Sequence, residues 1–154
     1  MPIIILTTSI HAPIEHCFDL ARSIDLHVQS TKQTGERAIA GVTSGLIGLN
    51  QSVTWRAKHF GIWQQLTSKI TDLDPPYFFA DEMIKGAFHS FRHEHHFKLV
   101  DGITVMTDQF DYVSPLGKIG RLADWLFLKR YMTNLLTERN RVIKTVAEQS
   151  QTVK

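Results

Sequence analysis

The last part of the chain contains a stretch that we predict to form one long helix, from about Leu116 to about Val146. Apart from Gly117 and Gly120 near its start, this stretch lacks glycine and proline, the residues that most often interrupt helices. In its second half, apolar residues recur at spacings of three and four: Leu128, Met132, Leu135, Leu136, Val142, Ile143 and Val146. This spacing places them on one narrow stripe, which packs against a single surface.

The first half of the helix is apolar around most of its circumference, through Ile119, Leu122, Ala123, Trp125, Leu126, Phe127 and Leu128. A sheet can cover only one side of such a segment. A ligand cavity, a flap, a second subunit or a membrane surface must therefore cover the other side. We interpret the basic residues Lys129, Arg130, Arg139, Arg141 and Lys144 as the solvated face opposite the stripe, and we expect no nucleic-acid partner.

Short runs rich in β-branched and aromatic residues precede this helix and predict strands. The first is Ile3–Ile10, and two short helices follow it, from Ile14 to about Ser23 and from Asp25 to Lys32, with Asp25 as the expected cap. Six further strands are predicted at Glu36–Val42, Gln51–Phe60, Ile62–Leu73, Tyr77–Lys85, Ser90–Val100 and Ile103–Val113. The 154 residues therefore predict a single α+β domain, large enough for a core without disulfide or metal.

Cellular location is inferred from the cysteine content and the first residues. The one cysteine, Cys17, lies on the apolar face of the first short helix and is expected in the core, so no internal disulfide forms. The apolar run at the N-terminus is only a few residues long and has no basic leader. We expect a cytoplasmic protein with neither a signal peptide nor a transmembrane span.

The pair Asp101-Gly102 predicts a tight hairpin turn, which fixes the register of the last two strands. Counting back from the turn gives the facing pairs Val100 with Ile103, Phe97 with Met106, His95 with Asp108, and His93 with Phe110. Alternation then places five residues on the inner face: Phe91, His93, His95, Phe97 and Leu99. In the preceding hairpin, the simplest pairing brings Met83 opposite His93 and Asp81 opposite His95. Asp81, His95 and Asp108 would then lie side by side.

Three interpretations of these histidines and aspartates are open. They can form a hydrogen-bonded network that orients the polar end of an apolar ligand, because a buried carboxylate or imidazole is costly when alone. They can perform general acid–base catalysis, with His95 oriented by Asp81 or Asp108. They can bind a metal ion, for which His93 and His95 project the same way and Asp81 or Asp108 would be the third ligand. We expect the network, and neither a metal ion nor a cofactor.

In chain order the sequence contains Ala12-Pro13-x-Glu15-x-x-Phe18-Asp19-Leu20, a meander of strands, Asp81-x-x-x-x-Gly86-x-Phe88, Phe91-x-His93-x-His95-x-Phe97, and the terminal helix. This arrangement resembles the START-like (SRPBCC) superfamily, which includes birch-allergen-like and polyketide cyclase/dehydrase-like proteins. The resemblance implies a helix-grip fold, in which a curved seven-stranded antiparallel sheet wraps around the C-terminal helix. It also implies a pocket between them for lipids, sterols, polyketides, quinones or similar molecules. Residues 41–48 match the glycine-rich loop of plant members only loosely, so no nucleotide role is implied.

We therefore expect binding or transport of an apolar small molecule, of lipid, polyketide, isoprenoid or quinone type, between sheet and helix. The expected lining is Trp55, Leu66, Met83, Phe97, Met106, Phe110, Leu122, Trp125 and Met132, with His93, His95, Asp81 and Asp108 meeting a polar group of the ligand. The apolar loop from Leu46 to Leu49 would form the entrance. Two alternatives are open: a cyclase, dehydratase or hydrolase that uses His95 with Asp81 or Asp108, and a protein or membrane interaction module that docks through Trp125 to Leu128.

Overall fold

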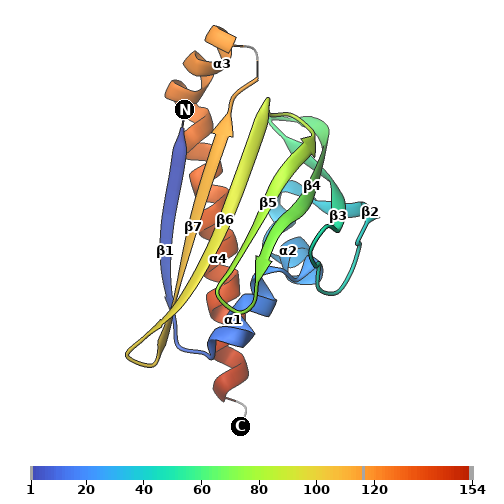
Figure 1. Ribbon diagram of the computed structural model, residues 1–154. Helices are drawn as coiled ribbons and strands as arrows, with labels where there is room; N and C mark the ends of the chain where they lie inside the picture. The colour runs from blue at the N-terminus through green and yellow to red at the C-terminus, as the bar shows by residue number, and fades with distance from the viewer. Residues whose placement is uncertain (1, 116, 153–154) are drawn as a thin grey trace.

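Seven strands form one antiparallel sheet in the computed structural model, which describes residues 2–115 and 117–152, except for the side chains at positions 124, 125 and 152 (Figure 1). The strand order is β1-β7-β6-β5-β4-β3-β2, so the first and last strands of the chain pair with each other. The strands are β1 Ile3–Ile10, β2 Arg37–Gly41, β3 Ser52–His59, β4 Ile62–Asp74, β5 Phe78–Lys85, β6 Ser90–Val100 and β7 Ile103–Val113. All seven predicted strands are confirmed.

Helices connect β1 to β2 and end the chain. The connection contains α1 (Ile14–Ala21), α2 (Ile24–Ser30) and the short 3-10 turn η1 (Lys32–Thr34). The C-terminal helix consists of α3 (Gly117–Ala123), a wider π-helical turn η2 (Asp124–Leu128) and α4 (Lys129–Thr152). Figure 1 shows α4 running along one face of the sheet, and α4 contacts β1, α1 and α2. The predicted α+β class and helix-grip fold are therefore confirmed.

The cap of α2 differs from the prediction. The side-chain hydroxyl of Ser23, not the carboxylate of Asp25, accepts the hydrogen bond from the backbone N–H of Leu26. The carboxylate of Asp25 instead accepts from the backbone N–H of Gly45, at 2.9 Å. Ser23 precedes the first helical residue, and its short side chain reaches the unpaired N–H groups there. Asp25 is already inside the helix and thus ties α2 to the following loop.

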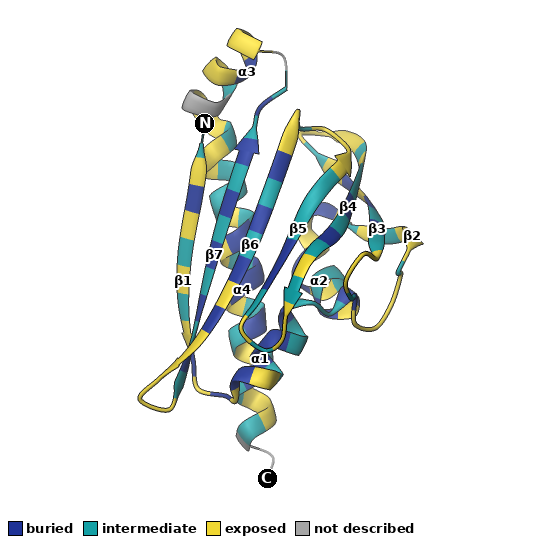
Figure 2. Cartoon of the chain, viewed as in Figure 1, coloured by how far each residue is buried: buried dark blue, intermediate teal, exposed yellow. Residues whose placement is uncertain are grey.

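Alternation along β6 and β7 produces the buried face of the sheet (Figure 2). The predicted register of this hairpin is confirmed over its whole length, from Val100 opposite Ile103 to His93 opposite Phe110. Phe91, His93, His95 and Phe97 are buried, as expected. Leu99 is the exception, since its side chain is exposed. Leu99 is the second-last residue of β6, next to the turn of the hairpin, so facing inward there does not bury it.

The register between β5 and β6 differs from the prediction by two residues. Asp81 pairs with His93 and Phe79 with His95, whereas Met83 pairs with Ser68 on β4. Beyond Glu82, β5 keeps its pairing with β4 but has no partner on β6, so the connection is longer than a tight turn. Two register irregularities between β4 and β5 accompany this, and such bulges bend a sheet. Because the shift is an even number, Asp81 still faces inward.

The main core lies where α1 and α2 pack between the sheet and α4. It includes Cys17, as predicted, and burial raises the pKa of that thiol. Ile47 also belongs to this core, and its N–H donates to the carbonyl oxygen of Arg22. The loop from Leu46 to Leu49 is therefore anchored against α1 and α2, and none of its residues is among those that line the cavity described below. The expectation that it forms the entrance is wrong.

Candidate functional site

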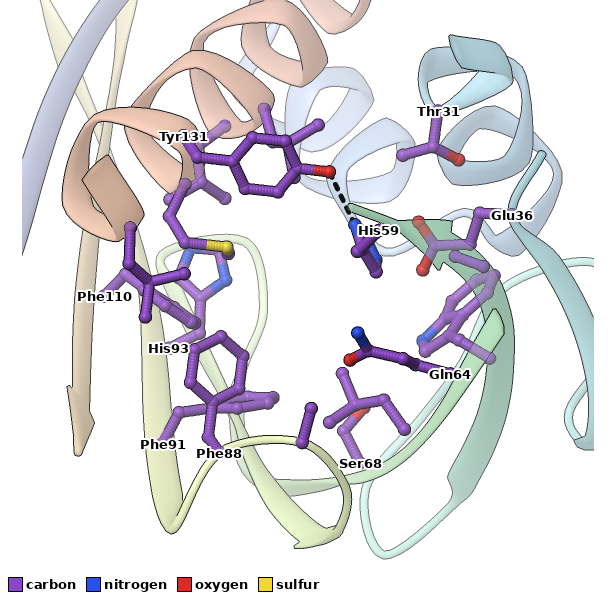
Figure 3. A pocket seen from close by; sticks show the side chains of 18 of the residues that line it. Thr31, Glu36, His59, Gln64, Ser68, Phe88, Phe91, His93, Phe110 and Tyr131 are labelled. Carbon is purple, nitrogen blue, oxygen red and sulfur yellow. Dashed lines mark hydrogen bonds between the residues drawn. The ribbon is translucent and has the colours of Figure 1, made fainter. Parts of the chain in front are cut away.

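A cavity of about 450 Å³ lies between the inner face of the sheet, α2, and the first half of the C-terminal helix (Figure 3). This volume is within the range of small-molecule binding sites. Aromatic and aliphatic side chains form most of its wall, including Trp55, Leu66, Phe88, Phe91, Phe110, Phe127, Leu128, Met132, Leu135 and Leu136. The sheet and the stripe of α4 therefore do not fill the space between them.

Six residues of the expected site line this cavity: Trp55, Leu66, Asp81, His93, Phe110 and Met132. Phe97 and Met106 do not, because they pack in the main core with Phe18 and Phe79. Met83 packs against the smaller core cluster beside the cavity, and Leu122 is exposed. The side chain of Trp125 lies outside the described part of the structure. On the sheet the cavity thus excludes the part that carries Phe97 and Met106, and on the C-terminal helix it extends past the expected Met132 to Arg139.

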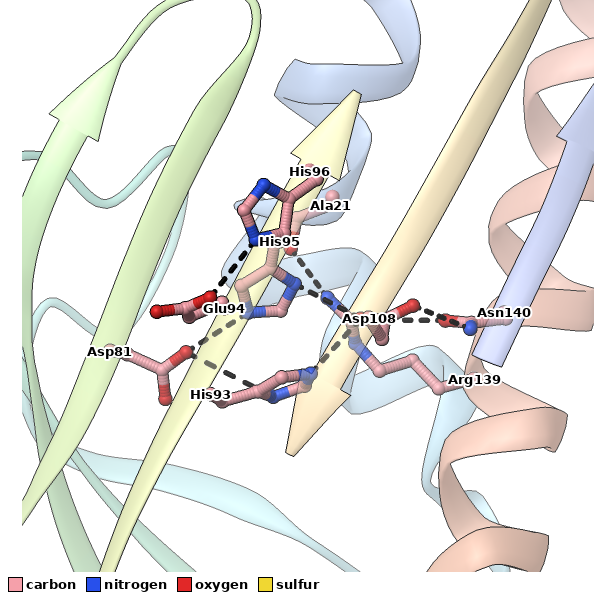
Figure 4. A network of polar contacts seen from close by, with 9 residues as sticks. All are labelled: Ala21, Asp81, His93, Glu94, His95, His96, Asp108, Arg139 and Asn140. Carbon is pink, nitrogen blue, oxygen red and sulfur yellow. Dashed lines mark hydrogen bonds and ion pairs between the residues drawn. The ribbon is translucent and has the colours of Figure 1, made fainter. Parts of the chain in front are cut away.

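The four histidine and aspartate side chains form one network, as the sequence predicted (Figure 4). His95 lies between the two carboxylates, with Nε2 3.0 Å from Asp81 Oδ1 and Nδ1 3.2 Å from Asp108 Oδ1. The ring of His93 lies beside that of His95, with centroids 3.9 Å apart, and its Nε2 is hydrogen-bonded to Asp108 Oδ1 at 3.0 Å. Asp81 and His93 border the cavity, whereas His95 is 2% exposed and stacks on Phe79. His95 therefore does not reach a ligand in the cavity.

Arg139 completes this network, and the sequence analysis did not include this residue in it. Its Nη1 lies 3.4 Å from Asp108 Oδ1, and its Nη2 donates to the carbonyl oxygen of Ala21. Asn140 donates to Asp108 Oδ2 at 2.7 Å. Arg139 was expected on the solvated helix face, but it is buried. The signal was available, because position 139 fills the gap in the apolar stripe between Leu136 and Ile143.

The electrostatics of the network favour ionised carboxylates. Burial opposes the charge of Asp108, but the hydrogen bond from His93, the close contact with His95 and the charge of Arg139 outweigh it and hold the pKa of Asp108 well below 3.8. Burial likewise opposes the charge of Asp81, and the histidines lower its pKa by the same means. Burial and the neighbouring charge of His95 lower the pKa of His93. The neutral imidazole of His93 is therefore favoured at neutral pH.

A second polar group lines the opposite wall of the cavity, from α2, β3, α4 and the residue that precedes β2 (Figure 3). His59 is hydrogen-bonded through Nδ1 to the hydroxyl of Tyr131 at 2.7 Å. His27 Nε2 lies 3.2 Å from Glu36 Oε1, and its ring packs on Trp55. Burial opposes ionisation of Glu36, but His27 outweighs it and lowers the pKa of Glu36. None of these polar residues was identified from the sequence, since α2 is too short for its spacing to indicate a buried face.

Apolar side chains are exposed near the part of the cavity wall that Phe127 and Leu128 form. Phe127, itself 51% exposed, packs edge-on against Phe60 at the β3–β4 turn. Ile119, Leu122 and Leu126 are exposed on the same helical segment. The chain thus presents an apolar rim beside its cavity. Among the described residues, no helix is long and apolar enough to cross a membrane.

The whole fold is similar to that of several solved structures. Protein TTHA0849 from Thermus thermophilus is 17% identical, with 95% of this chain and 99% of that chain covered and a TM-score of 0.73. Major latex-like protein 151 from Panax ginseng is 16% identical, with 95% and 97% covered and a TM-score of 0.70. Ara h 8.0201 is 10% identical, with 92% and 97% covered and a TM-score of 0.63.

These identities establish the fold and leave the activity open. No family model and no curated protein sequence matches the chain. The resemblance to START-like proteins that the sequence indicated is therefore confirmed at the level of the fold.

Proposed function

We propose that the protein binds or carries an apolar small molecule in the cavity between its sheet and its C-terminal helix. The observation that carries this proposal is the cavity itself, about 450 Å³ with a predominantly apolar wall. A closely packed interior lacks voids of this size, because unfilled apolar space forfeits packing energy. The fold supports the proposal, since helix-grip proteins hold hydrophobic ligands in the corresponding place.

The ligand that suits this cavity is apolar along its length and polar at two positions. Asp81 and His93 border one wall, and Glu36 and His59 border the opposite wall. Because the pKa of Glu36 is lowered by His27, its carboxylate accepts a hydrogen bond, for example from a hydroxyl group of the ligand. A polycyclic or isoprenoid molecule with hydroxyl or carbonyl groups at both ends has this chemistry.

Native mass spectrometry of protein purified from its host, followed by a screen of lipids, polyketides and quinones, tests the proposal. We expect one bound molecule per chain, and displacement of a fluorescent apolar probe by hydroxylated members of the library. Glu36→Gln is expected to weaken the binding of hydroxylated ligands more than the binding of their deoxygenated analogues. Lys32→Gln, a change at an exposed position on the neighbouring turn, is the control. A protein that retains no molecule and binds no probe would contradict the proposal.

A second candidate function, contact with a lipid surface, is favoured by the apolar rim. Ile119, Leu122 and Leu126 are exposed there, and Lys118 and Arg121 are exposed beside them. Apolar and basic side chains on one helix are typical of segments that lie on anionic membranes. Sedimentation with anionic and with zwitterionic vesicles tests this role. We expect binding to the anionic vesicles only, and no binding to either would exclude it.

A further inference from the structure

We propose that Asp81, His93 and His95 form a binding site for one divalent transition-metal ion in the wall of the cavity. Each residue offers one ligand atom, and these atoms all lie within 4.8 Å of one another. Asp81 Oδ1 lies 3.0 Å from His95 Nε2 and 4.0 Å from His93 Nδ1. Nitrogen and oxygen ligands lie at about 2.1 Å from such an ion, which places neighbouring ligands roughly 3 to 4 Å apart. Both distances from Asp81 Oδ1 have this spacing without any ion present, and the two nitrogens lie no more than 4.8 Å apart.

The opposite nitrogen of each imidazole faces one carboxylate, that of Asp108. His93 Nε2 is hydrogen-bonded to Asp108 Oδ1 at 3.0 Å, which leaves His93 Nδ1 as the nitrogen nearest Asp81. Asp108 is itself held by Asn140 and Arg139, so the imidazole is fixed in orientation (Figure 4). Histidine ligands of metals usually have such a partner, since it selects the tautomer and makes the ligating nitrogen more basic.

His95 supplies an independent argument, because its Nδ1 is buried without a well-aligned hydrogen bond in the described structure. When Nε2 donates to Asp81, neutral His95 has no proton at Nδ1. A metal ion at Nε2 would instead place the proton at Nδ1, 3.2 Å from Asp108 Oδ1. Asp108 Oδ1 would then face an N–H group of each histidine, at 3.0 Å from His93 Nε2 and 3.2 Å from His95 Nδ1.

The cluster also has a place for a cation beside Asp81. The guanidinium of Arg139 pairs with Asp108, whereas the ion-pair contacts of Asp81 among the described residues are with His93 and His95 only. An ion held there would face the carboxylate of Asp81 at short range. The remaining coordination positions of an ion there would face the cavity, because Asp81 and His93 line it. Water or an oxygen atom of a ligand can occupy them.

The test uses protein without a histidine tag, stripped with a chelator and titrated with Co²⁺ and with Zn²⁺. We expect one ion per chain by calorimetry and metal analysis, and visible absorption of Co²⁺ that Zn²⁺ abolishes. Asp81→Asn is expected to reduce affinity more than about 100-fold, since loss of an outer partner alone costs about 10- to 100-fold. Asp108→Asn removes such a partner, so we expect it to reduce affinity by about 10- to 100-fold. His96→Gln, on the exposed face of the same strand, should bind as the wild type does.

Proton NMR of the wild type loaded with Co²⁺ makes the result independent of variant folding. Two strongly shifted exchangeable imidazole signals are expected, one from each histidine. The proposal is overturned if wild-type protein takes up no stoichiometric ion. It is also overturned if Asp81→Asn, folded by circular dichroism, binds Co²⁺ with unchanged affinity, or if only one imidazole signal is shifted. None of these results depends on whether the cavity binds an apolar ligand.

Discussion

Arg139 on α4 and Asp108 on β7 form an ion pair, with Nη1 3.4 Å from Oδ1, in which both side chains are almost completely buried. The pair joins the C-terminal helix to the centre of the sheet's inner face. Arg139 also donates to Ala21 at the end of α1, so three elements meet at one guanidinium. The network beside the cavity therefore also holds the helix in place.

Arg139→Met is expected to destabilise the protein by about 3 to 5 kcal/mol, because removal of one partner leaves the buried carboxylate of Asp108 uncompensated. Arg92→Met is the matched control. Arg92 also pairs with carboxylates, those of Asp72, Glu82 and Glu94, but on the outer face of the sheet. Its loss is expected to cost no more than about 1 kcal/mol. Urea unfolding measures both changes, and equal losses of stability would show that the buried pair contributes no more than the exposed one.

Glu148 is expected to add a pH-dependent contribution to stability. Its carboxylate accepts from Lys144 and from the backbone of His11, and these hydrogen bonds lower the pKa of Glu148 from 4.5 to about 2. The folded-state pKa lies below the unfolded value, so the contribution is complete above pH 4.5 and is lost as the pH falls towards 2. Glu148→Gln should cost less than about 1 kcal/mol at pH 7, since the pair is partly exposed.

Chemical denaturation of the wild type and of Glu148→Gln between pH 7 and pH 2 provides the measurement. The two stability curves are expected to converge across the interval from pH 4.5 to 2. Glu138→Gln, whose carboxylate pairs with Arg141 within the exposed face of α4, is the control that removes a carboxylate without detaching the helix from β1. A constant difference at every pH would refute the assignment.

Gly120→Ala is expected to destabilise the start of the C-terminal helix. A Cβ atom there would lie 1.8 Å from the carbonyl oxygen of Pro115, a backbone atom that cannot move aside alone. Alanine favours helix by up to about 1 kcal/mol over glycine. Overpacking costs about 1 to 3 kcal/mol, so the clash should dominate.

Thermal unfolding and hydrogen exchange of α3 would show this effect. Gly48→Ala is the control, since the nearest atom to its added Cβ is a side-chain oxygen 3.4 Å away. Equal stability of Gly120→Ala and wild type would mean that α3 does not pack as described.

Local signals in the sequence were sufficient for the strands and helices, and the resemblance to START-like proteins supplied their arrangement. The Asp101-Gly102 turn determines the β6–β7 register, because a two-residue hairpin leaves one pairing that buries the alternate residues. No comparable turn joins β5 to β6, and the register there was predicted two residues away from its true position. Sheet curvature decides that pairing, and curvature depends on bulges that have no clear sequence signal.

The candidate site was only partly predictable, because its members come from distant elements. His93, His95, Asp81 and Asp108 could be placed together, since strand alternation keeps them on one face. Arg139 was assigned to solvent from its charge, although its position in the stripe pointed inward. Phe97 and Met106 were placed in the cavity because they face inward, but α1 covers that part of the sheet. Facing inward does not distinguish a core from a cavity wall.

The most direct test of the proposed binding role is a substitution that fills the cavity. Ala57→Trp places a large side chain at a position that lines it, and Lys58→Trp places the same side chain on the opposite face of β3. Binding of a fluorescent apolar probe is measured for both variants, with circular dichroism to verify folding. We predict that Ala57→Trp binds the probe at least tenfold more weakly than the wild type, whereas Lys58→Trp binds it as the wild type does. Equal binding by two folded variants would contradict it.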